Sequence, residues 1–537
     1  MWKNLNTKKR FLFSIIAGGL MIISFPFTGS LPVLSFVSWV PLLLIENDVF
    51  ENQKKVSTVF VHSILVFFFY NIGTTWWIWN SSPLGSVLAI GANTILMAIT
   101  FLLYHFVKKY IGAKQGILSF PFLWIAFEHL HHQWQISWPW LTYGNVFSVW
   151  PSWVQWYEYT GILGGSLWIL SLNILIFKLL VSSDKIKNQK RRIITFLVVL
   201  FFPLLFSLFT YYNYEEQKAP VELLVIQPNI DPYNEKFNGS TLQQVHKIIS
   251  KSDSLATSNT AFVIAPETAI SVSIHEDQMN RYRHLSDIRN WLKYNTNIHF
   301  LVGAFTRKTF NQKNSRASQK LPASNQYVEY YNSSIGIEDK QQYQIIHKSK
   351  LVPGVEQVPF GDWLKFLDEF SNENGGTSGS LGIEKEAKVM KSKHGIFAPS
   401  ICYESIYGGY VSDQCRKGAE MIFVITNDGW WGNTPGHKQH LSFSSLRAIE
   451  NRRSVARSAN TGISAIINQR GDIVKQTSWW KEDAIKASIN KNNKVTFYTK
   501  YGDFIGRSFS FVACLLLLYL VISYLKKKLN INKLKKP

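Results

Sequence analysis

The sequence has few cysteines and few charged side chains. It contains only three cysteines in 537 residues, and none of them forms a Cys-x-x-Cys pair. A disulfide framework, a zinc ribbon and a thioredoxin-like redox site are therefore excluded. Only 17% of the residues are charged, whereas 46% are hydrophobic and 15% aromatic. Disordered chains and nucleic-acid-binding chains are rich in charge and poor in apolar side chains, so both classes are excluded as well.

The hydrophobic residues are concentrated in eight runs that contain almost no charge. They lie at 11–27, 31–45, 57–79, 87–107, 117–130, 161–181, 193–209 and 508–525. A helix that crosses a bilayer needs about 20 mostly apolar residues. We therefore predict seven membrane helices before residue 212 and an eighth near the end of the sequence. Basic residues precede the first run as in a signal peptide, but no Ala-x-Ala site follows, so we expect a retained helix.

The charges predict which connections face the cytoplasm. Lys and Arg outnumber Asp and Glu by 57 to 35, a formal net charge of +22, and they cluster at 8–10, 54–55, 108–114, 185–192 and 526–536. Every second connection is thus basic, as the positive-inside rule requires of cytoplasmic loops. We expect both termini in the cytoplasm. The connections at 80–86 and 133–159 and the segment 213–507 are expected on the periplasmic side. The second connection is rich in tryptophan, which is typical of an interfacial belt or of the mouth of a lipid-binding cleft.

Residues 213–507 have the composition of a soluble domain. Apolar strands are predicted at 221–227, 261–267, 299–305, 331–337, 396–404, 421–427 and 462–468. Amphipathic helices are predicted at 241–256, 278–294, 405–418 and 437–451. Because the strands are apolar without interruption, we expect a sheet that is covered on both faces. The polar stretches 311–326 and 371–392 are expected to be loops.

Three strand ends carry residues that are capable of catalysis. Glu267 ends an apolar strand, where partial burial would raise its pKa and suit it to proton transfer. Lys348 and Glu356 flank a turn that contains Pro353. Cys402 lies between a strand and a helix, where backbone N–H groups and the helix dipole would stabilise a thiolate. Taken alone, Glu267 is better explained as a structural carboxylate. The alternatives are a solvated loop charge for Lys348 or Glu356 and a buried structural cysteine for Cys402.

The order Glu, Lys, Cys on successive strand ends is more informative than any one of these residues. Further motifs lie before, between and after them. These are WPWLTYG at 138–144, QPNI at 227–230, APE at 265–267, KxxLVPxxE at 348–356, CYE at 402–404, NDxWxG at 427–432, HxxH at 437–440, RAIE at 447–450 and RSANTG at 457–462. With these motifs the sequence resembles the nitrilase superfamily and, more closely, its membrane-embedded family, the apolipoprotein N-acyltransferases. The resemblance extends over nearly the whole chain.

The resemblance implies a fold and a set of site residues. The fold would be an eight-span α-helical membrane bundle, formed by 1–212 and 508–537, with an α/β nitrilase-like α-β-β-α sandwich at 213–507. Cys402 would be the nucleophile, Glu267 the general base and Lys348 the electrostatic stabiliser. Further supporting positions would be Glu356, Tyr403 and Glu404, together with Trp140 and Tyr143 of the WPWLTYG stretch. The family's proline-Phe-Gly-Glu turn is Pro353-Gly354-Val355-Glu356 here, and Phe237 stands where the family often has tryptophan.

The activity implied by the resemblance is acyl transfer through a thioester. A membrane glycerophospholipid would acylate Cys402, and the α-amine of a diacylglyceryl-modified N-terminal cysteine on an apolipoprotein would then receive the acyl chain. No cofactor, no metal and no nucleic acid is implied, and the protein is expected to be a monomer in the bacterial inner membrane. Loops at 353–372 and the tryptophan-rich connection are expected to exclude water.

Two other functions are consistent with parts of the sequence. A membrane-tethered nitrilase-type amidase would use the same three residues but release the acyl group to water. A lipid-binding protein with an inactive outer domain would not need all three. His129, His131 and His132 and the pair His437 and His440 lack an HExxH pattern, so we expect no metal site. Cys415 is expected to pack in a helix and Cys514 to lie in the last span; a Cys402–Cys415 bridge would block the nucleophile.

Overall fold

The computed structural model describes residues 4–181, 186–322, 324–340, 342–360 and 380–534. The described chain forms two compact units. One is helical and consists of 1–79, 83–212 and 503–537, and the other consists of 80–82 and 213–502. Residues 361–379, which include parts of the loops expected at 353–372 and 371–392, lie outside the described residues.

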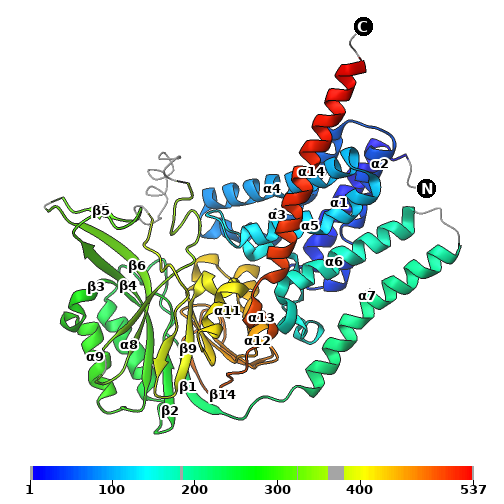
Figure 1. Ribbon diagram of the computed structural model, residues 1–537. Helices are drawn as coiled ribbons and strands as arrows, with labels where there is room; N and C mark the ends of the chain where they lie inside the picture. The colour runs from blue at the N-terminus through cyan, green and yellow to red at the C-terminus, as the bar shows by residue number, and fades with distance from the viewer. Residues whose placement is uncertain (1–3, 182–185, 323, 341, 361–379, 535–537) are drawn as a thin grey trace. The chain divides into compact units, whose positions relative to one another are not determined.

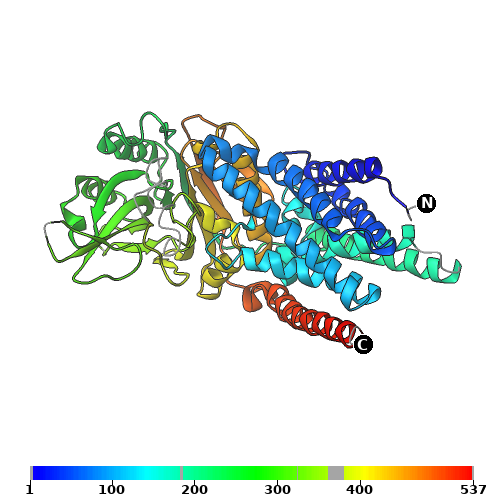
Figure 2. The ribbon, with the colours of Figure 1, turned by 90° about the horizontal axis from the view of Figure 1, so that it is seen from above.

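The helical unit contains eight long segments that correspond to the eight apolar runs. They are α1 (Thr7–Ser24), α2 (Val40–Glu51) with a preceding 3₁₀ turn at Pro32–Phe36, α3 (Val56–Thr75), α4 (Pro83–Tyr110), α5 (Ala113–His131), α6 (Tyr157–Val181), α7 (Ile186–Asn213) and α14 (Phe504–Leu534). Helices α1, α3, α4, α5 and α14 pack against one another in that order, as Figure 2 shows from above. Short 3₁₀ turns at Pro139–Leu141, Tyr143–Phe147 and Pro151–Trp153 form the tryptophan-rich connection.

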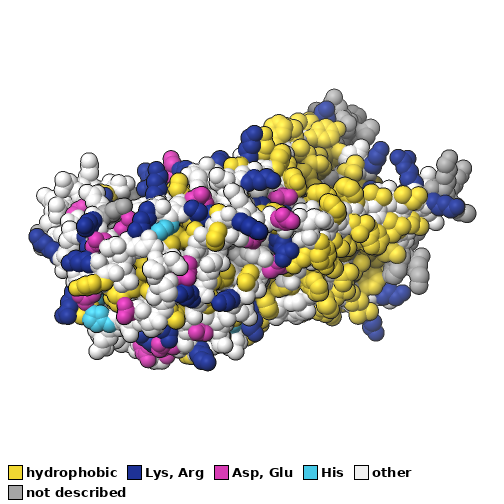
Figure 3. Space-filling model, turned by 90° about the horizontal axis from the view of Figure 1, so that it is seen from below, with side chains coloured by type: hydrophobic (Ala, Val, Ile, Leu, Met, Phe, Trp, Pro, Cys, Tyr) yellow, Lys and Arg dark blue, Asp and Glu magenta, His cyan; other side chains and the backbone are white. Residues whose placement is uncertain are grey.

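Six segments among the described residues are long and apolar enough to cross a membrane. They are Pro32–Glu51, Val56–Asn80, Pro83–Tyr110, Tyr157–Val181, Asn188–Asn213 and Phe504–Leu529. Helix α1 is not among them, since it includes three basic residues, and α5 carries Lys114 and Glu128. Large apolar side chains such as Phe202, Phe209 and Phe511 are exposed on this unit, and Figure 3 shows apolar side chains gathered over part of the surface. An exposed apolar surface of this kind is suited to lipid.

The second unit is built on two β-sheets. The eight-stranded sheet has the order β14-β1-β2-β4-β6-β5, with β3 beside β4 and β7 beside β6. Its strands are β1 (Pro220–Gln227), β2 (Thr260–Ile264), β3 (Ile270–His275), β4 (His299–Phe310), β5 (Gln319–Lys320), β6 (Tyr327–Ile337), β7 (Gln344–His347) and β14 (Asp483–Asn490). The six-stranded sheet has the order β13-β12-β11-β10-β9-β8. Its strands are β8 (Met390–Ser392), β9 (Gly395–Ile401), β10 (Met421–Thr426), β11 (Val455–Ala459), β12 (Ala465–Ile467) and β13 (Ile473–Gln476).

The two sheets pack face to face and are covered by helices. Apolar side chains of both sheets, among them Leu223, Phe262, Phe397 and Phe423, form a core between them. A second core joins the larger sheet to α8 (Thr241–Asp253) and α9 (Arg283–Leu292), which lie beside it in Figure 1. Helices α11 (Gly408–Arg416) and α12 (Pro435–Asn451) contact strands of the smaller sheet. The layers are therefore α-β-β-α, and burial on both faces explains the uninterrupted apolar strands.

Several predicted boundaries differ from the structure. The helix expected at 278–294 is a 3₁₀ segment, Glu276–Arg281, followed by α9, and the helix expected at 405–418 begins only at Gly408. The strands expected at 261–267 and 396–404 end at Ile264 and Ile401. Glu267 and Cys402 therefore stand just beyond the strands that precede them.

Candidate active site

Glu267 follows β2 by three residues and is 6% exposed. Its Oε1 accepts hydrogen bonds from Asn332 Nδ2 at 2.8 Å and from Lys348 Nζ at 3.2 Å. Its Oε2 accepts from the backbone N–H of Asn427 at 3.1 Å. The carboxylate thus receives donors from β6, from the end of β7 and from the end of β10, and these fix its position.

Lys348 is the first residue after β7 and is 1% exposed. Its Nζ lies between two carboxylates, 3.2 Å from Glu267 Oε1 and 2.8 Å from Glu356 Oε1. Glu356 is held in turn by Asn332 Nδ2 at 3.0 Å and by the backbone N–H of Val352 at 2.8 Å. Burial would lower the pKa of Lys348, but the charges of Glu267, Glu356 and Cys402 outweigh it and raise that pKa well above its usual range. The ammonium group is therefore permanently charged at neutral pH.

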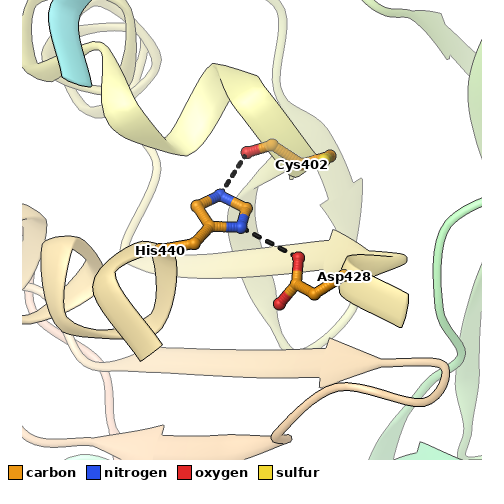
Figure 4. A group of neighbouring side chains, drawn as sticks. All are labelled: Cys402, Asp428 and His440. Carbon is orange, nitrogen blue, oxygen red and sulfur yellow. Dashed lines mark hydrogen bonds and ion pairs between the residues drawn. The ribbon is translucent and has the colours of Figure 1, made fainter. Parts of the chain in front are cut away.

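Cys402 stands in the turn that joins β9 to a 3₁₀ segment, Cys402–Ile406. Its φ of 50° is in the left-handed region, which is costly for a residue other than glycine and is typical of strained functional sites. Its carbonyl oxygen lies 3.1 Å from His440 Nε2, the contact drawn in Figure 4. The backbone of Cys402 is therefore held by a side chain of α12.

A buried charge cluster lies beneath Cys402. His440 Nδ1 lies 2.9 Å from Asp428 Oδ1, and Arg457 Nη2 lies 2.5 Å from Asp428 Oδ2 and 3.1 Å from His440 Nδ1. Burial would raise the pKa of Asp428, but the charges of Arg457 and His440 lower it. One ligand atom each from Cys402, Asp428 and His440 lie within 4.8 Å of one another, a spacing that a metal could use. Because the Arg457 guanidinium already binds Asp428, we interpret the group as a hydrogen-bonded support.

The structure corrects two expectations about proton affinity. Burial does favour a higher pKa for Glu267, but the Lys348 ammonium, the Asn332 amide and the Lys236 ammonium outweigh it, so that the pKa is lowered. Cys402 was expected to favour the thiolate, yet burial and the Glu267 charge raise the pKa of its thiol despite the opposing charge of Lys348. A five-residue 3₁₀ segment does not offset these effects. The resting pair is therefore a carboxylate and a neutral thiol.

The supporting residues lie in different places. Glu404 is fully buried and accepts backbone N–H groups from Ser349 at 2.5 Å and Ile401 at 2.8 Å, and Tyr403 is buried against Tyr407. Burial raises the pKa of Glu404 to about 7. Phe237 is more than half exposed. Their predicted roles stay predictions.

Trp140 and Tyr143 are buried inside the helical unit. The Trp140 ring lies 4.7 Å from that of Trp77, and the Tyr143 hydroxyl lies 2.5 Å from Ser38 Oγ. These two rings of the tryptophan-rich connection are therefore core residues rather than part of an exposed interfacial belt, although Trp150 is exposed. Their role in substrate binding stays a prediction.

Residues that the sequence did not single out complete the site. Asn332 bridges both carboxylates from the middle of β6, and Lys236 lies beside Glu267 in the loop between β1 and α8. The only signal for Asn332 is a polar residue within an apolar strand. Together the groups form a thiol, a carboxylate base and a fixed cation, the set required for covalent acyl chemistry.

Two family models match the sequence of this chain. Residues 17–175 match the apolipoprotein N-acyltransferase N-terminal domain, and residues 225–494 match the carbon-nitrogen hydrolase family. The apolipoprotein N-acyltransferase of Chlorobaculum tepidum is 30% identical over 512 residues, which cover 93% of this chain and 94% of that protein. This chain belongs to the apolipoprotein N-acyltransferase family. The Geobacter metallireducens member of the family is 26% identical, with 92% of each chain covered.

Solved structures with similarity to the chain include a member of the nitrilase superfamily and an amidase. Saccharomyces cerevisiae Nit3 is 14% identical with a TM-score of 0.36, covering 54% of this chain and 97% of its own. An amidase from Nesterenkonia is 11% identical with a TM-score of 0.35, covering 53% and 94%. The assignment to the apolipoprotein N-acyltransferase family rests on the sequence matches and not on these structures.

Proposed function

We propose that this chain moves a fatty acyl group from a membrane glycerophospholipid to the α-amine of a diacylglyceryl-modified N-terminal cysteine on an apolipoprotein. The observation that carries the proposal is the set of buried Glu267, buried Lys348 and partly buried Cys402, whose charges act on one another, in a chain of this family. Cys402 is the proposed nucleophile, Glu267 the base and Lys348 the oxyanion stabiliser, while Glu356 and Asn332 position Lys348 and Glu267.

In the first half-reaction the Glu267 carboxylate takes the proton of the Cys402 thiol while the sulfur attacks the ester carbonyl. Because the thiol pKa is raised and the carboxylate is ionised, transfer and attack occur together rather than from a resting thiolate. The charged Lys348 and a backbone N–H near Tyr403 stabilise the oxyanion, each such donor contributing roughly 3 to 4 kcal/mol. The ester C–O bond then breaks, Glu267 returns its proton to the leaving oxygen, and a lysophospholipid departs.

In the second half-reaction the free amine of the apolipoprotein attacks the thioester carbon. Glu267 accepts a proton from the attacking nitrogen, the C–S bond breaks, and the same proton returns to the Cys402 sulfur. The products are an N-acylated lipoprotein and the starting enzyme, so one base serves both steps. Water in the site would divert the thioester to free fatty acid.

The proposed setting is the bacterial inner membrane. We propose a membrane domain at 1–212 with seven spans, a catalytic domain at 213–507 on the periplasmic side, and an eighth span with a basic cytoplasmic tail at 508–537, so that both termini lie in the cytoplasm. The alternating basic connections support this orientation, and six described helices meet the length and apolarity required. A monomer suffices, because all three proposed catalytic residues come from one chain.

Intact-mass spectrometry tests the reaction. The purified protein is incubated with phospholipid and then with a diacylglyceryl-cysteine peptide. We expect a hydroxylamine-labile acyl adduct that maps to Cys402 and moves to the peptide amine. Glu267→Gln should slow acylation by roughly 10² to 10⁴-fold, because the base is lost while the hydrogen-bonding shape is kept.

The matched cysteine control is Cys415→Ala, which removes a buried thiol from α11 and should leave the adduct intact. Cys402→Ala should abolish it. An adduct released only as free fatty acid would favour a membrane-tethered hydrolase of the amidase type. A persistent adduct in Cys402→Ala would refute the assignment of the nucleophile.

A further inference from the structure

Lys236 is a buried cation that the proposed mechanism does not use. It lies in the loop between β1 and α8, is 3% exposed, and its backbone N–H donates to Asp231 O at 2.9 Å. Its Nζ donates to Thr268 Oγ1 and, at 3.4 Å, to the carbonyl oxygen of Glu267. The amide oxygen of Asn427, when turned toward the Lys236 and Trp430 donors, lies 2.9 Å from the same Nζ. The ammonium therefore joins the chain after β2 to the chain after β10.

The partners of Lys236 are neutral oxygens. Within the described part of the chain, Lys236 makes no ion pair with a carboxylate within 4.0 Å. A buried ammonium without a carboxylate partner is expensive, and lysines are almost never fully buried without one. Lys236 nevertheless interacts electrostatically with Glu267 and Cys402. Burial lowers the pKa of Lys236 to about 8, although those two charges oppose the change.

The other charged groups of the site indicate a role for the Lys236 ammonium. Lys348 carries one positive charge against two carboxylates, Glu267 and Glu356, which leaves one excess negative charge in this group, and the Glu267 charge acts on the Cys402 sulfur. A thiolate or an oxyanion would add a further negative charge to it. With Lys236 protonated, the two lysines balance the two carboxylates before the sulfur ionises.

We propose that Lys236 is a positioning residue and second cation of the active site, which holds the backbone of Glu267 and stabilises negative charge on the Cys402 sulfur. The role rests on the proposed function in that Cys402 is the nucleophile. It goes beyond the three-residue mechanism because it makes the reactivity of that sulfur depend on a fourth group. The other charged groups around the sulfur are already paired: Lys348 hydrogen-bonds to Glu267 and Glu356. Asp428, whose charge also raises the pKa of the Cys402 thiol, is paired with Arg457.

The test measures alkylation of Cys402 by iodoacetamide, a neutral reagent, between pH 6 and pH 10. A Cys514→Ser background removes the exposed cysteine, and peptide mass spectrometry assigns the label to Cys402 rather than to buried Cys415. Lys236→Met should react about tenfold more slowly than the parent at pH 7, since a nearby opposite charge changes a pKa by one unit or more. The difference should vanish above pH 9, where the parent lysine has lost its proton.

Two further variants separate charge from packing. Lys236→Arg keeps the charge at every pH, so it should match the parent at pH 7 and react faster than the parent above pH 9. This comparison stands even if Lys236→Met does not fold. Lys247→Met, which removes a partly exposed lysine paired with Glu482, should follow the parent at all pH values.

A rate ratio between Lys236→Met and the parent that is the same at every pH would overturn the proposal, as would an arginine variant as slow as the methionine variant. Both results would indicate a packing role. The assay contains no acyl donor. Absence of acyl transfer with the expected alkylation profile would therefore count against the proposed function and leave the role of Lys236 standing.

Discussion

At the scale of single residues, the pKa of each buried carboxylate in the site depends on whether a cation lies beside it. Glu267 and Glu404 are both carboxylates that follow or adjoin an apolar strand, yet their pKa values move in opposite directions. Glu267 has Lys348 at 3.2 Å, whereas Glu404 is held mainly by backbone N–H groups. At Glu404 the backbone donors do not overcome the cost of burying the charge, whereas at Glu267 the ammonium groups together with the Asn332 amide do.

Glu404 makes the stability of the protein depend on pH. Its folded pKa of about 7 lies above the unfolded value of about 4.5, because burial favours the neutral carboxyl. The stabilisation is complete below pH 4.5 and is lost as the pH rises through 7. We expect Glu404→Gln to remove this dependence, so that the difference in melting temperature between the parent and the variant declines from pH 4.5 to pH 8.

The matched control is Glu338→Gln. His299 donates to Glu338 and lowers its pKa, so the sign is reversed. The parent should gain stability over this variant as the pH rises through the acidic range. A difference for Glu404→Gln that rises with pH, measured by thermal unfolding in detergent, would contradict the assignment of a raised pKa.

The three proposed catalytic residues could be selected from the sequence because their order at strand ends and turns, together with the surrounding motifs, resembles that of the nitrilase superfamily. The directions of their pKa shifts could not be predicted from the sequence, since the shifts depend on Lys236, Asn332 and Asp428, which come from other strands and loops. Contacts across the sandwich are set by register and turn geometry. A single sequence does not encode them in any local pattern.

At the scale of elements, the turn from β9 into the following 3₁₀ segment matters most. The predicted strand of 396–404 ends early because Cys402 turns into the left-handed region, which a continuous apolar pattern does not reveal. Short edge strands such as β5 and β8 were missed, since two or three residues give no alternation. Strand β11 was missed because its sequence, VARSA, contains a buried arginine.

The strained turn predicts an unusual order of stability among variants of Cys402. Glycine normally costs up to about 1 kcal/mol relative to alanine, but at a positive φ alanine carries a cost of roughly 1 to 2 kcal/mol that glycine avoids. We therefore expect Cys402→Gly to be at least as stable as Cys402→Ala. The measurement is the free energy of unfolding in denaturant.

Cys415 provides the comparison, since it is a buried cysteine in the last turn of α11 and its φ is not positive. There glycine should be about 1 kcal/mol less stable than alanine. The same order at both positions would show that the Cys402 backbone is not strained.

At the scale of the whole molecule, composition alone separated the apolar helices from the soluble unit. The number of spans is harder to obtain, because α1 and α5 carry charged side chains and depend on their neighbours for burial. In α1, for example, Arg10 pairs with Asp48 of α2. An assessment of the apolarity of one helix at a time does not take such partners into account.

The orientation can be measured by labelling single cysteines in a cysteine-free background. With eight spans, Gln133→Cys should react with a membrane-impermeant maleimide in intact spheroplasts, and Gln53→Cys only after lysis; both positions are exposed. Asn6→Cys should behave like Gln53→Cys, since both are expected in the cytoplasm. Labelling of Asn6→Cys in intact spheroplasts would mean that α1 does not place the N-terminus inside.

The pairing of β1 with β14 has a consequence for biosynthesis. Pro220 lies opposite Asn490, and strands β1 and β14 run antiparallel over eight positions. The first strand of the larger sheet therefore cannot complete its hydrogen bonds until the last strand of that sheet has been made. During synthesis β1 emerges with its edge unpaired on that side, while α8, β2 and all the later strands are still to come. Long-range pairings of this kind fold slowly and leave edges open to aggregation. The unit should therefore complete its fold only after β14 has been synthesised, and a holding chaperone that covers the open edge of β1 would raise its yield.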